Sequence, residues 1–593
     1  MKNFFTLFLA MALCGLTTAQ DVIEIAPGAA NAGLLETTIN NDVDGNGDRL
    51  NPNRIYRLME GIHFQLSAIN VSNPNGTIFI EGATGGKKPV FIPIATNDID
   101  PGENIINGSL SLKNVHLQGR NDIGGGLFAR WNINGQDRKI TVENCLLEFA
   151  QHQWFFANAV TQGLVIEMRN NYFRDLFWDD QWWASRVFEA KVPIDTLIFE
   201  NNTVTGSGMA LLQQEALCSY ALINHNSFIN NHGYIMVNNY YLEAYFTNNL
   251  YINSQIKGED FTVASVEPDK IATCIMGLDT INTSIALPEG ALNQDSTALL
   301  PPYNDIANYK VYASNNIYYN EPTLSPYYTG TYNTLYDAPV SYLNWFGDGP
   351  WEVAVPTPWM NSRAQALYAD WPNIIEEHTT MDTDPGLGQE ALTANAADQL
   401  AIWNRILYGV PEAQGMTYDL NDYYFGDNDH STIPGVETED GDGIVNFYDL
   451  IEDLSINSSF ASTLDGHTIG ALHWTNEIDN FDPDASLTSI LNGYAGIPNS
   501  VTAPYNDVFE LAQNQPNPFT QSTDITFSMH KKAHVTLTIH NAFGVQVATV
   551  MEGVQNAGNY NVTWDASSVA SGIYFYTLEA DNIKATGKML VVK

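Results

Sequence analysis

The feature that most constrains this fold is an asparagine that recurs along the chain, each time followed by β-forming residues such as Val-His-Leu or Ser-Phe-Ile. It stands at Asn114, Asn144, Asn171, Asn202, Asn226, Asn249 and Asn316. The first five intervals are 23 to 31 residues long, and the last, of 67 residues, leaves room for an excursion. An interval of that length accommodates three short strands and three turns, as in one coil of a parallel β-helix.

Asparagine suits this position for a physical reason. Equivalent residues of stacked coils lie ~4.8 Å apart along the axis, so a buried turn asparagine can hydrogen-bond to its equivalents on both neighbouring coils. It also tolerates the left-handed backbone that a tight turn requires. β-rich segments flank the asparagines, and a third strand set is predicted at 127–130, 155–158, 187–190, 211–214 and 235–238. A β-sandwich with chance asparagines would not place matching strands around so many of them.

This arrangement resembles the pectin-lyase-like superfamily of right-handed parallel β-helices over about residues 50–320. The resemblance implies an all-β fold, in which a right-handed parallel β-helix is followed by a small antiparallel β-sandwich. The sequence contains no catalytic signature of a named lyase family, so the likeness in fold does not settle the chemistry.

The C-terminal part carries the most specific motif. The segment Phe509-Glu-Leu-Ala-Gln-Asn-Gln-Pro-Asn-Pro-Phe519 leads into strands that alternate apolar and polar residues, and the chain ends in Lys588-Met-Leu-Val-Val-Lys593. Alternation over ~75 residues predicts a small antiparallel sandwich. The order of motifs closely resembles the C-terminal sorting domain of type IX secretion systems. That resemblance implies that residues 508–593 are an export address read by the type IX secretion machinery.

The N-terminus has the features of a secretory signal peptide. Lys2 is followed by an apolar stretch from Phe4 to Leu16, and Thr17-Thr18-Ala19 offers the small residues of a cleavage site. No other run approaches the ~18 apolar residues of a transmembrane segment. We therefore expect a secreted or outer-surface protein. Its expected parts are a signal peptide at 1–19, a β-helix at 20–345, acidic late coils with long loops at 346–493, a linker at 494–507 and the sorting domain at 508–593.

The formal net charge of −42 argues against nucleic acid and anionic membranes as partners. The charge is uneven along the chain. Residues 101–200 contain 9 basic and 12 acidic side chains, whereas residues 251–500 contain 5 basic and 36 acidic ones. A site for an acidic ligand is therefore expected in the first of these regions.

One acidic loop predicts a calcium (Ca2+) site with the oxygen spacing of an EF-hand-like loop. Its ligands would be Asp440, Asp442, Asn446 and Asp449. Thr438 stands where the first aspartate of such a loop is expected, and no second copy follows. A second acidic loop, 42–48, alternates oxygen-bearing side chains but lacks the last carboxylate. The alternative for both is a solvated acidic turn.

Two carboxylates are candidates for general acid–base catalysis. Glu148 and Asp175 each stand four residues after a recurring asparagine, so the alignment stacks them on adjacent coils ~5 Å apart. This is near the separation of the carboxylates in a retaining glycosidase. The alternative is that both hydrogen-bond to turn backbone while Arg174 balances their charge.

A second candidate cluster is basic and consists of Arg130, Arg186 and Lys191, which lie near the third strand set. A lyase that acts on uronate sugars must neutralise a carboxylate and remove the C5 proton, and arginine, lysine or calcium suit these tasks. Substrate-binding candidates in the same region are Trp178, Trp182 and Trp183. Their rings could stack on sugar rings or, alternatively, cover the core.

Two functions stay open. The first is an exported enzyme that acts on a polysaccharide, either a lyase or a glycoside hydrolase. The second is a non-catalytic glycan-binding or adhesin-like surface protein. The fold, the export signals, the tryptophans and the bases favour the first, and the lack of a recognised catalytic motif favours the second.

Overall fold

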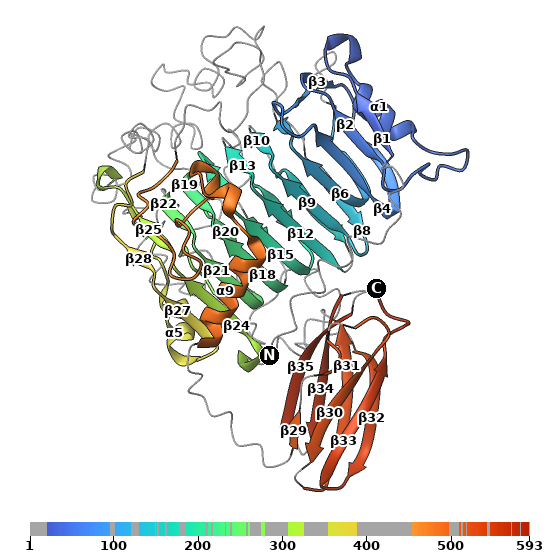
Figure 1. The fold of residues 1–593 in the computed structure, drawn as a ribbon, viewed down its shortest axis with the longest axis vertical. Helices are drawn as coiled ribbons and strands as arrows, with labels where there is room; N and C mark the ends of the chain where they lie inside the picture. The colour runs from blue at the N-terminus through green and yellow to red at the C-terminus, as the bar shows by residue number, and fades with distance from the viewer. Residues whose placement is uncertain are drawn as a thin grey trace.

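A computed structural model describes most of the chain (Figure 1). The described residues are 21–94, 101–119, 130–148, 150, 153–160, 163–174, 176, 186–207, 212–214, 217–231, 233–237, 240–255, 259–260, 274–278, 306–324, 354–387, 454–496, 509–511, 514–517, 519–529, 531–541, 546–570, 572–580 and 583–591.

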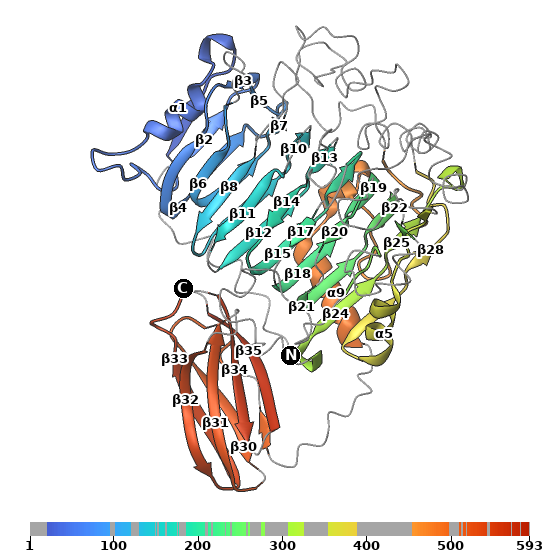
Figure 2. The same cartoon turned by 180° about the vertical axis from the view of Figure 1, so that it is seen from behind.

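Three ladders of parallel strands form the walls of a β-helix (Figures 1 and 2). Sheet one contains β1 (Val22–Ile25), β2 (Ile55–Leu58), β4 (Asn70–Gly82), β6 (Asn104–Lys113), β9 (Lys139–Glu143), β12 (Leu164–Arg169), β15 (Ile194–Glu200), β18 (Cys218–Asn224), β21 (Tyr241–Thr247), β24 (Lys310–Ser314) and β27 (Ile374–Glu377). Sheet two contains β3 (Ile62–Gln65), β5 (Val90–Pro93), β7 (His116–Gln118), β10 (Leu146–Glu148), β13 (Tyr172–Arg174), β16 (Thr203–Thr205), β19 (Ser227–Asn231), β22 (Leu250–Ser254), β25 (Ile317–Tyr319) and β28 (Thr380–Met381).

Sheet three contains β8 (Trp131–Gly135), β11 (Phe155–Val160), β14 (Phe188–Ala190), β17 (Leu212–Gln214) and β20 (Met236–Val237). It joins sheet one through the long strand β6, whose first half pairs with β8 and whose second half pairs with β9. The strand that pairs with β11 at this end is β8, since Trp131 pairs with Phe155, and residues 127–129 of the strand predicted at 127–130 lie outside the described residues.

The interior of the coils is apolar and continuous from one coil to the next. Aromatic rings stack along it: the centroids of Phe173 and Phe199 are 6.0 Å apart, those of Phe199 and Phe228 6.1 Å, and those of Phe228 and Tyr251 5.1 Å. Burial of such rings is the main apolar contribution to stability. It also explains why the strands are short, since each contributes only one or two inward side chains per coil.

An asparagine ladder occupies the turn between sheets one and two, as the sequence predicted for five of its members. These are Asn171, Asn202, Asn226, Asn249 and Asn316, and the side-chain amide of each of the first four donates to the next member's side-chain oxygen at 2.9–3.2 Å. The oxygens of the last four also accept the preceding member's backbone N–H, at 3.0 Å between Asn171 and Asn202. The Asn171 oxygen accepts the backbone N–H of Cys145 at 2.9 Å. The buried amides are therefore satisfied on both neighbouring coils.

The first two asparagines do not belong to this ladder, which corrects the alignment by one residue. Leu146 pairs with Tyr172, so Asn144 aligns with Asn170 and not with Asn171. Asn114 and Asn144 occupy the preceding turn position, which has a left-handed backbone with φ of 54° and 52°. Later coils repeat that position as Asn170, Asn201, His225, Asn248, Asn315 and His378. Asparagine is favoured at both positions, which is why the sequence pattern merged them.

A column of alternating charges runs beside this turn on the outer face of sheet one. Its members, in register from coil to coil, are Glu24, Arg57, Glu81, Lys113, Glu143, Arg169 and Glu200. Nitrogen–oxygen distances of 2.8 Å join Arg57 to Glu81 and Lys113 to Glu143, and Arg169 lies 3.1 Å from Glu200. After Glu200 the column becomes neutral, starting with Asn224.

A segment that follows the last coil in sequence, residues 454–496, packs on the outside of the β-helix. Before it come the two-stranded pair β23 (Glu259–Asp260) and β26 (Ala354–Val355), and α5 (Ser362–Asp370). Residues 454–496, called the strap here, contain α9 (Pro483–Gly496). They span the end of the segment interpreted as late coils, 346–493, and the first three residues of the predicted linker. They add no strand to the three sheets and cover the outer faces of sheets one and two (orange in Figure 1).

The C-terminal sandwich has its own apolar core. One antiparallel sheet contains β29 (Phe509–Leu511), β30 (Ser522–Met529) and β33 (Gly558–Asp565), and the other contains β32 (Gln546–Gln555), β31 (Ala533–Asn541), β34 (Gly572–Ala580) and β35 (Ile583–Val591). The predicted fold class, a parallel β-helix followed by a small antiparallel sandwich, is confirmed.

Candidate functional site

The outer face of sheet three brings the three predicted bases together. Phe156 on β11 points outward, because its neighbours Phe155 and Ala157 both belong to the inner core. The guanidinium carbon of Arg130 lies 5.0 Å from the centre of the Phe156 ring, and the Lys191 amine lies 5.9 Å from it. Cations at these distances are attracted to an aromatic face. Register explains the meeting, since Phe156 pairs with Asn132 on β8 and Glu189 on β14.

Two carboxylates balance these bases. Arg130 and the side-chain amide of Asn132 both hydrogen-bond to Glu103. Arg186 forms an ion pair with Glu189, whose other oxygen lies 3.1 Å from the Lys191 amine. The sheet-three cluster, as we call it, consists of Glu103, Arg130, Asn132, Phe156, Arg186, Glu189 and Lys191.

Exposure differs sharply within the sheet-three cluster. The side chains of Arg186 and Glu189 are 6% and 4% exposed, whereas that of Lys191 is 41% exposed. The buried Arg186–Glu189 pair therefore holds the exposed Lys191 amine through the Glu189 carboxylate. Arg130 is 17% exposed and lies near the surface in the same cluster. Such an arrangement can present two cations and one aromatic ring to a ligand with an apolar face and a negative group.

Glu148 lies elsewhere, on the outer face of sheet two, and its environment differs from the one expected. The register pairs it with Arg174 on the next coil, so its predicted stacking on Asp175 is wrong by one position. Its two oxygens lie 2.6 Å from His116 Nε2 and 2.5 Å from Arg174 Nε. The alignment failed because Asn144 was equated with Asn171.

The surroundings of Glu148 hold it as a carboxylate. Burial by itself would raise its pKa, but the charges and hydrogen bonds of Arg174 and His116 lower the pKa below its usual value. The side chains of Glu148 and His116 are both 0% exposed. A general acid needs the opposite, a raised pKa and access to the substrate.

Several predicted residues lie outside the described part of the chain. They are Asp175, Trp178, Trp182, Trp183, Asp440, Asp442, Asn446 and Asp449. The other acidic loop is described. Its Asp42 pairs with Arg49 and Arg54, and Asp44 Oδ1 accepts backbone N–H groups of Asn46 and Asp48 at 2.8 and 3.0 Å. Within the described residues, no group of three or more His, Cys, Asp or Glu side chains is placed to hold a metal ion.

Sequence reasoning missed Phe156, His116 and Glu189. Phe156 could have been found, because the alternation of the third strand set puts one of the two adjacent phenylalanines outside. His116 and Glu189 gave no comparable signal, since their roles depend on the neighbours that the coil register brings to them.

Comparison with known proteins identifies the C-terminal part. Residues 515–593 match the family described as the secretion system C-terminal sorting domain. No curated protein and no solved structure matches the chain. Among the described helices, none has the length and apolar character needed to cross a membrane. The C-terminal sandwich therefore belongs to the secretion system sorting-domain family, and the chain is a type IX-secreted protein destined for the medium or the outer cell surface.

Proposed function

We propose that this exported β-helix acts on an acidic polysaccharide at the sheet-three cluster, as a lyase. The observation that carries the proposal is the placement of Arg130 and Lys191 close to the Phe156 ring, at 5.0 and 5.9 Å from its centre. A uronate sugar offers an apolar ring face for Phe156 and a carboxylate for the cations. The location also agrees with the charge distribution, because the strongly acidic 251–500 region would repel a polyanion.

The roles within the cluster follow from the chemistry of the side chains. Arg130 would neutralise the substrate carboxylate, since a guanidinium stays charged and donates two parallel hydrogen bonds. Lys191 would remove the C5 proton, because an amine can lose its own proton whereas a guanidinium cannot. Arg186 and Glu189 would position that amine from below. The tryptophans Trp178, Trp182 and Trp183 are proposed to add stacking surface, and calcium at the 440–449 loop remains a proposal for stability.

The hydrolase alternative has less support. Its proposed residues Glu148 and Asp175 require a raised pKa on one carboxyl group, whereas the pKa of Glu148 is lowered by Arg174 and His116. A non-catalytic, glycan-binding or adhesin-like role has one specific observation in its favour. Both surface cations already have carboxylate partners, Glu103 for Arg130 and Glu189 for Lys191, so the cluster could bind an anion without reacting.

The test is a panel of acidic and neutral polysaccharides, followed by the ultraviolet absorbance of unsaturated uronates and by new reducing ends. A lyase gives both signals with an acidic glycan, and Lys191→Ala abolishes them while binding weakens by less than about tenfold. Phe156→Ala weakens binding by about fivefold, from the loss of ~1 kcal/mol of ring contact. Lys139→Ala is the matched control, since Lys139 is a 48% exposed lysine paired with Glu167 on sheet one.

Each other outcome has a definite meaning. New reducing ends without the ultraviolet absorbance of unsaturated uronates indicate a hydrolase, for which Glu148 and Asp175 are the candidate catalytic residues. Binding without either product indicates the non-catalytic role. Activity that persists in Lys191→Ala places the reaction elsewhere, and the absence of binding to every glycan overturns the proposal.

A further inference from the structure

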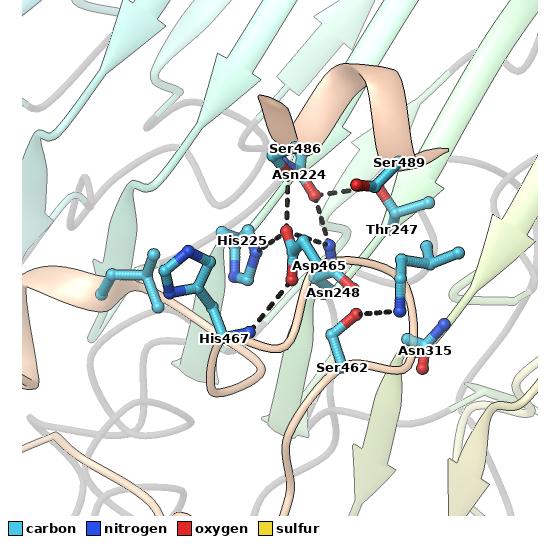
Figure 3. A network of polar contacts seen from close by, with 12 residues as sticks. Asn224, His225, Thr247, Asn248, Asn315, Ser462, Asp465, His467, Ser486 and Ser489 are labelled. Atoms are coloured by element: carbon cyan, nitrogen blue, oxygen red, sulfur yellow. Dashed lines mark hydrogen bonds and ion pairs between the residues drawn. The ribbon is translucent and has the colours of Figure 1, made fainter. Parts of the chain in front are cut away.

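The strap covers one apolar patch on the outside of sheet two and one on the outside of sheet one. Between the two patches, a polar network joins the strap to the turn (Figure 3). Asp465 Oδ2 accepts from Ser486 Oγ at 2.6 Å and lies 2.9 Å from His225 Nε2. Asn224, the first neutral member of the charge column, donates to Ser486 Oγ at 3.3 Å. These outer surfaces of the β-helix are therefore occupied by the protein's own chain.

The sorting domain, by contrast, has an edge strand that is left open. β32 pairs with β31 on one side and with no described strand on the other. None of its ten residues is buried, and the side chain of Val554 is 59% exposed. A Cβ atom added at Gly553 would meet no other heavy atom within 4 Å, so the strand is open on its inner side as well. β33, the edge of the second sheet, lies on the same side of the sandwich (Figures 1 and 2).

This edge lacks the usual protection against pairing with another chain. Edge strands commonly carry lysine or proline, or are covered by another segment. β35, the opposite edge of the same sheet, contains Lys584 and Lys588, and its Val591 forms a bridge with Phe519. Residues 546–565, which span β32 and β33, contain no lysine, arginine or proline, and only two acidic side chains. An added strand could therefore pair with β32 without burying a cation.

Only half of β32 has the regular geometry that a new strand needs. Its pairing with β31 shifts register twice, next to Val550 and next to Val547. Such bulges interrupt the ladder and twist an edge away from further pairing. Residues 551–555, in contrast, pair one to one with residues 533–537 of β31. A segment of five residues is an ordinary length for a strand.

The β-helix covers the other end of this sheet. His540 on β31 and Phe575 on β34 are paired and face outward, because the next residues of both strands toward the sandwich interior, Ile539 and Tyr576, belong to its core. Phe575 is nevertheless only 5% exposed and belongs to the apolar cluster of the β-helix. His534, near the other end of β31, is exposed and pairs with Val554. The attached β-helix therefore leaves residues 551–555 accessible.

We propose that residues 551–555 of β32 are the docking site for the secretion machinery, which adds a strand of its own to this edge. The domain belongs to a sorting-domain family, so it needs a surface that a receptor can reach while the β-helix is attached. An added strand gains affinity from main-chain hydrogen bonds and specificity from alternate side chains. Glu552 and Val554 are both exposed and lie on the same face. The partner strand is therefore expected to place a basic side chain beside Glu552 and an apolar one beside Val554.

The alternative occupant of this edge is a second copy of the chain. Two sorting domains joined through residues 551–555 would share one short ladder. That contact is far smaller than the ~1,200–2,000 Å² buried in a stable protein–protein interface. A secretion complex can add contacts elsewhere on the chain, and a short ladder also allows release after export. The observations therefore favour the secretion machinery, and the proposal is independent of the polysaccharide site on sheet three.

The first test is export of the full chain from type IX-secreting cells. Val554→Lys places a cation where the partner strand would have to desolvate it, so the amount at the surface or in the medium should fall by at least about tenfold. Val554→Ile should be exported normally. Thr526→Lys is the matched control, because Thr526 is an exposed residue of β30, which lies between β29 and β33. Urea unfolding checks that each variant keeps the sandwich folded. Normal export of Val554→Lys overturns the proposal.

The second test detects the contact directly and stays valid if Val554→Lys does not fold. A photoreactive benzoylphenylalanine is introduced in place of Val554, and in a separate control in place of Thr526. Irradiation of living cells should join the first chain, and not the second, to a subunit of the outer-membrane secretion machinery, identified by mass spectrometry. An adduct of two copies of this chain, equal adducts from both positions, or no adduct from the Val554 position overturns the proposal.

Discussion

The β-helix and the sorting domain differ in which side chains face each other on neighbouring strands. Residues 509–593 contain 5 basic and 6 acidic side chains, while the rest of the chain contains 20 and 61. In the sandwich, antiparallel neighbours such as β30 and β33 place different side chains opposite each other, for example Asp524 opposite Thr563. One column of the other sheet is an exception, since it repeats threonine at Thr549, Thr538, Thr577 and Thr586. In the β-helix, equivalent positions of successive coils stack directly, so the same kind of residue meets itself many times.

Stacking of identical residues stabilises the fold when the side chains can hydrogen-bond to each other, and destabilises it when they repel each other. Asparagine both donates and accepts, so Asn202, Asn226 and Asn249 form a continuous ladder. Carboxylates cannot do so, and the charge column therefore alternates in sign. Where the column turns neutral, the strap covers the surface. The sandwich depends less on such stacking, because outside its column of threonines most of its antiparallel pairs join unlike residues.

The largest expected effect separates the two regions completely. A chain that lacks residues 509–593 should fail to reach the cell surface and should accumulate in the periplasm, because the sorting domain is the export address. The β-helix has a core of its own, so the trapped protein should remain folded and resistant to proteolysis. Fractionation with antibody detection measures the location. Surface appearance of the truncated chain at the normal level would contradict the assignment.

The next comparison sets one buried asparagine of the ladder against one of the sandwich. Asn226 donates to Phe199 O at 2.7 Å and Asn249 Oδ1 at 3.0 Å, and its oxygen accepts from Asn202. Asn226→Leu leaves partners on both neighbouring coils unsatisfied, so it should lower the free energy of unfolding by about 2–4 kcal/mol.

The matched sandwich variant is Asn514→Leu. The Asn514 amide donates to Thr523 Oγ1 at 2.8 Å, and the hydroxyl keeps its bond to Pro516 O at 2.7 Å. A smaller loss of about 1–2 kcal/mol is expected. Urea unfolding should show each variant shifting only its own transition. Equal losses, or a shared shift, would argue that the ladder adds nothing beyond an ordinary buried amide.

A third comparison lies within the charge column. Glu200 is 1% exposed and Arg169 31% exposed, whereas both members of the Lys113–Glu143 pair are about 40% exposed. Arg169→Leu should therefore lower stability by about 1–3 kcal/mol, because it leaves a buried carboxylate with less compensation. Lys113→Leu should change it by less than about 1 kcal/mol. Unfolding in low and high salt measures both, and a larger loss for Lys113→Leu would contradict the burial argument.

The sequence pattern predicted the structural features that recur in every coil and missed those that occur only once. Asn171 through Asn316 were assigned correctly because each ladder position recurs at coil spacing. Asn144 was misplaced by one residue, since two adjacent turn positions both favour asparagine. That error propagated to Glu148, whose partner is Arg174. The fold of the sandwich was predicted correctly because its alternating strands and end motifs are local signals.

The strap could not be predicted, because its contacts join residues far apart in the chain. His225 and Asp465 are separated by 240 positions, and neither forms part of a repeat of its own type. The same applies to the sheet-three cluster. The bases Arg130, Arg186 and Lys191 were identified from their region, but their arrangement around Phe156 depends on the register of three strands. Local patterns identify elements, whereas sites depend on which elements become neighbours.

The smallest expected effect tests whether the acidic character of the β-helix makes its stability depend on pH more than that of the sandwich. Asp195 is the second residue of the sheet-one strand β15. Burial, with a smaller contribution from the charge of Asp137, raises the pKa of Asp195 to about 7. Its Oδ1 has no hydrogen-bond partner among the described residues. A carboxyl group in this position prefers to be protonated when the protein is folded.

The sign of the effect follows from this preference. Between pH 3.8, the usual pKa of aspartate, and about 7, the folded state binds the extra proton. Stability should therefore fall as pH rises through this window and stay lower above it. Because Asp195 is only partly buried, water screens the penalty, and Asp195→Asn should raise the free energy of unfolding by about 1 kcal/mol at pH ~8. At pH ~4 the gain should vanish. Asp370→Asn, at the exposed end of α5, is the control. Equal stability of wild type and Asp195→Asn at alkaline pH would show that the charged carboxylate is solvated there, and the β-helix would then tolerate its acidity as readily as the sandwich does.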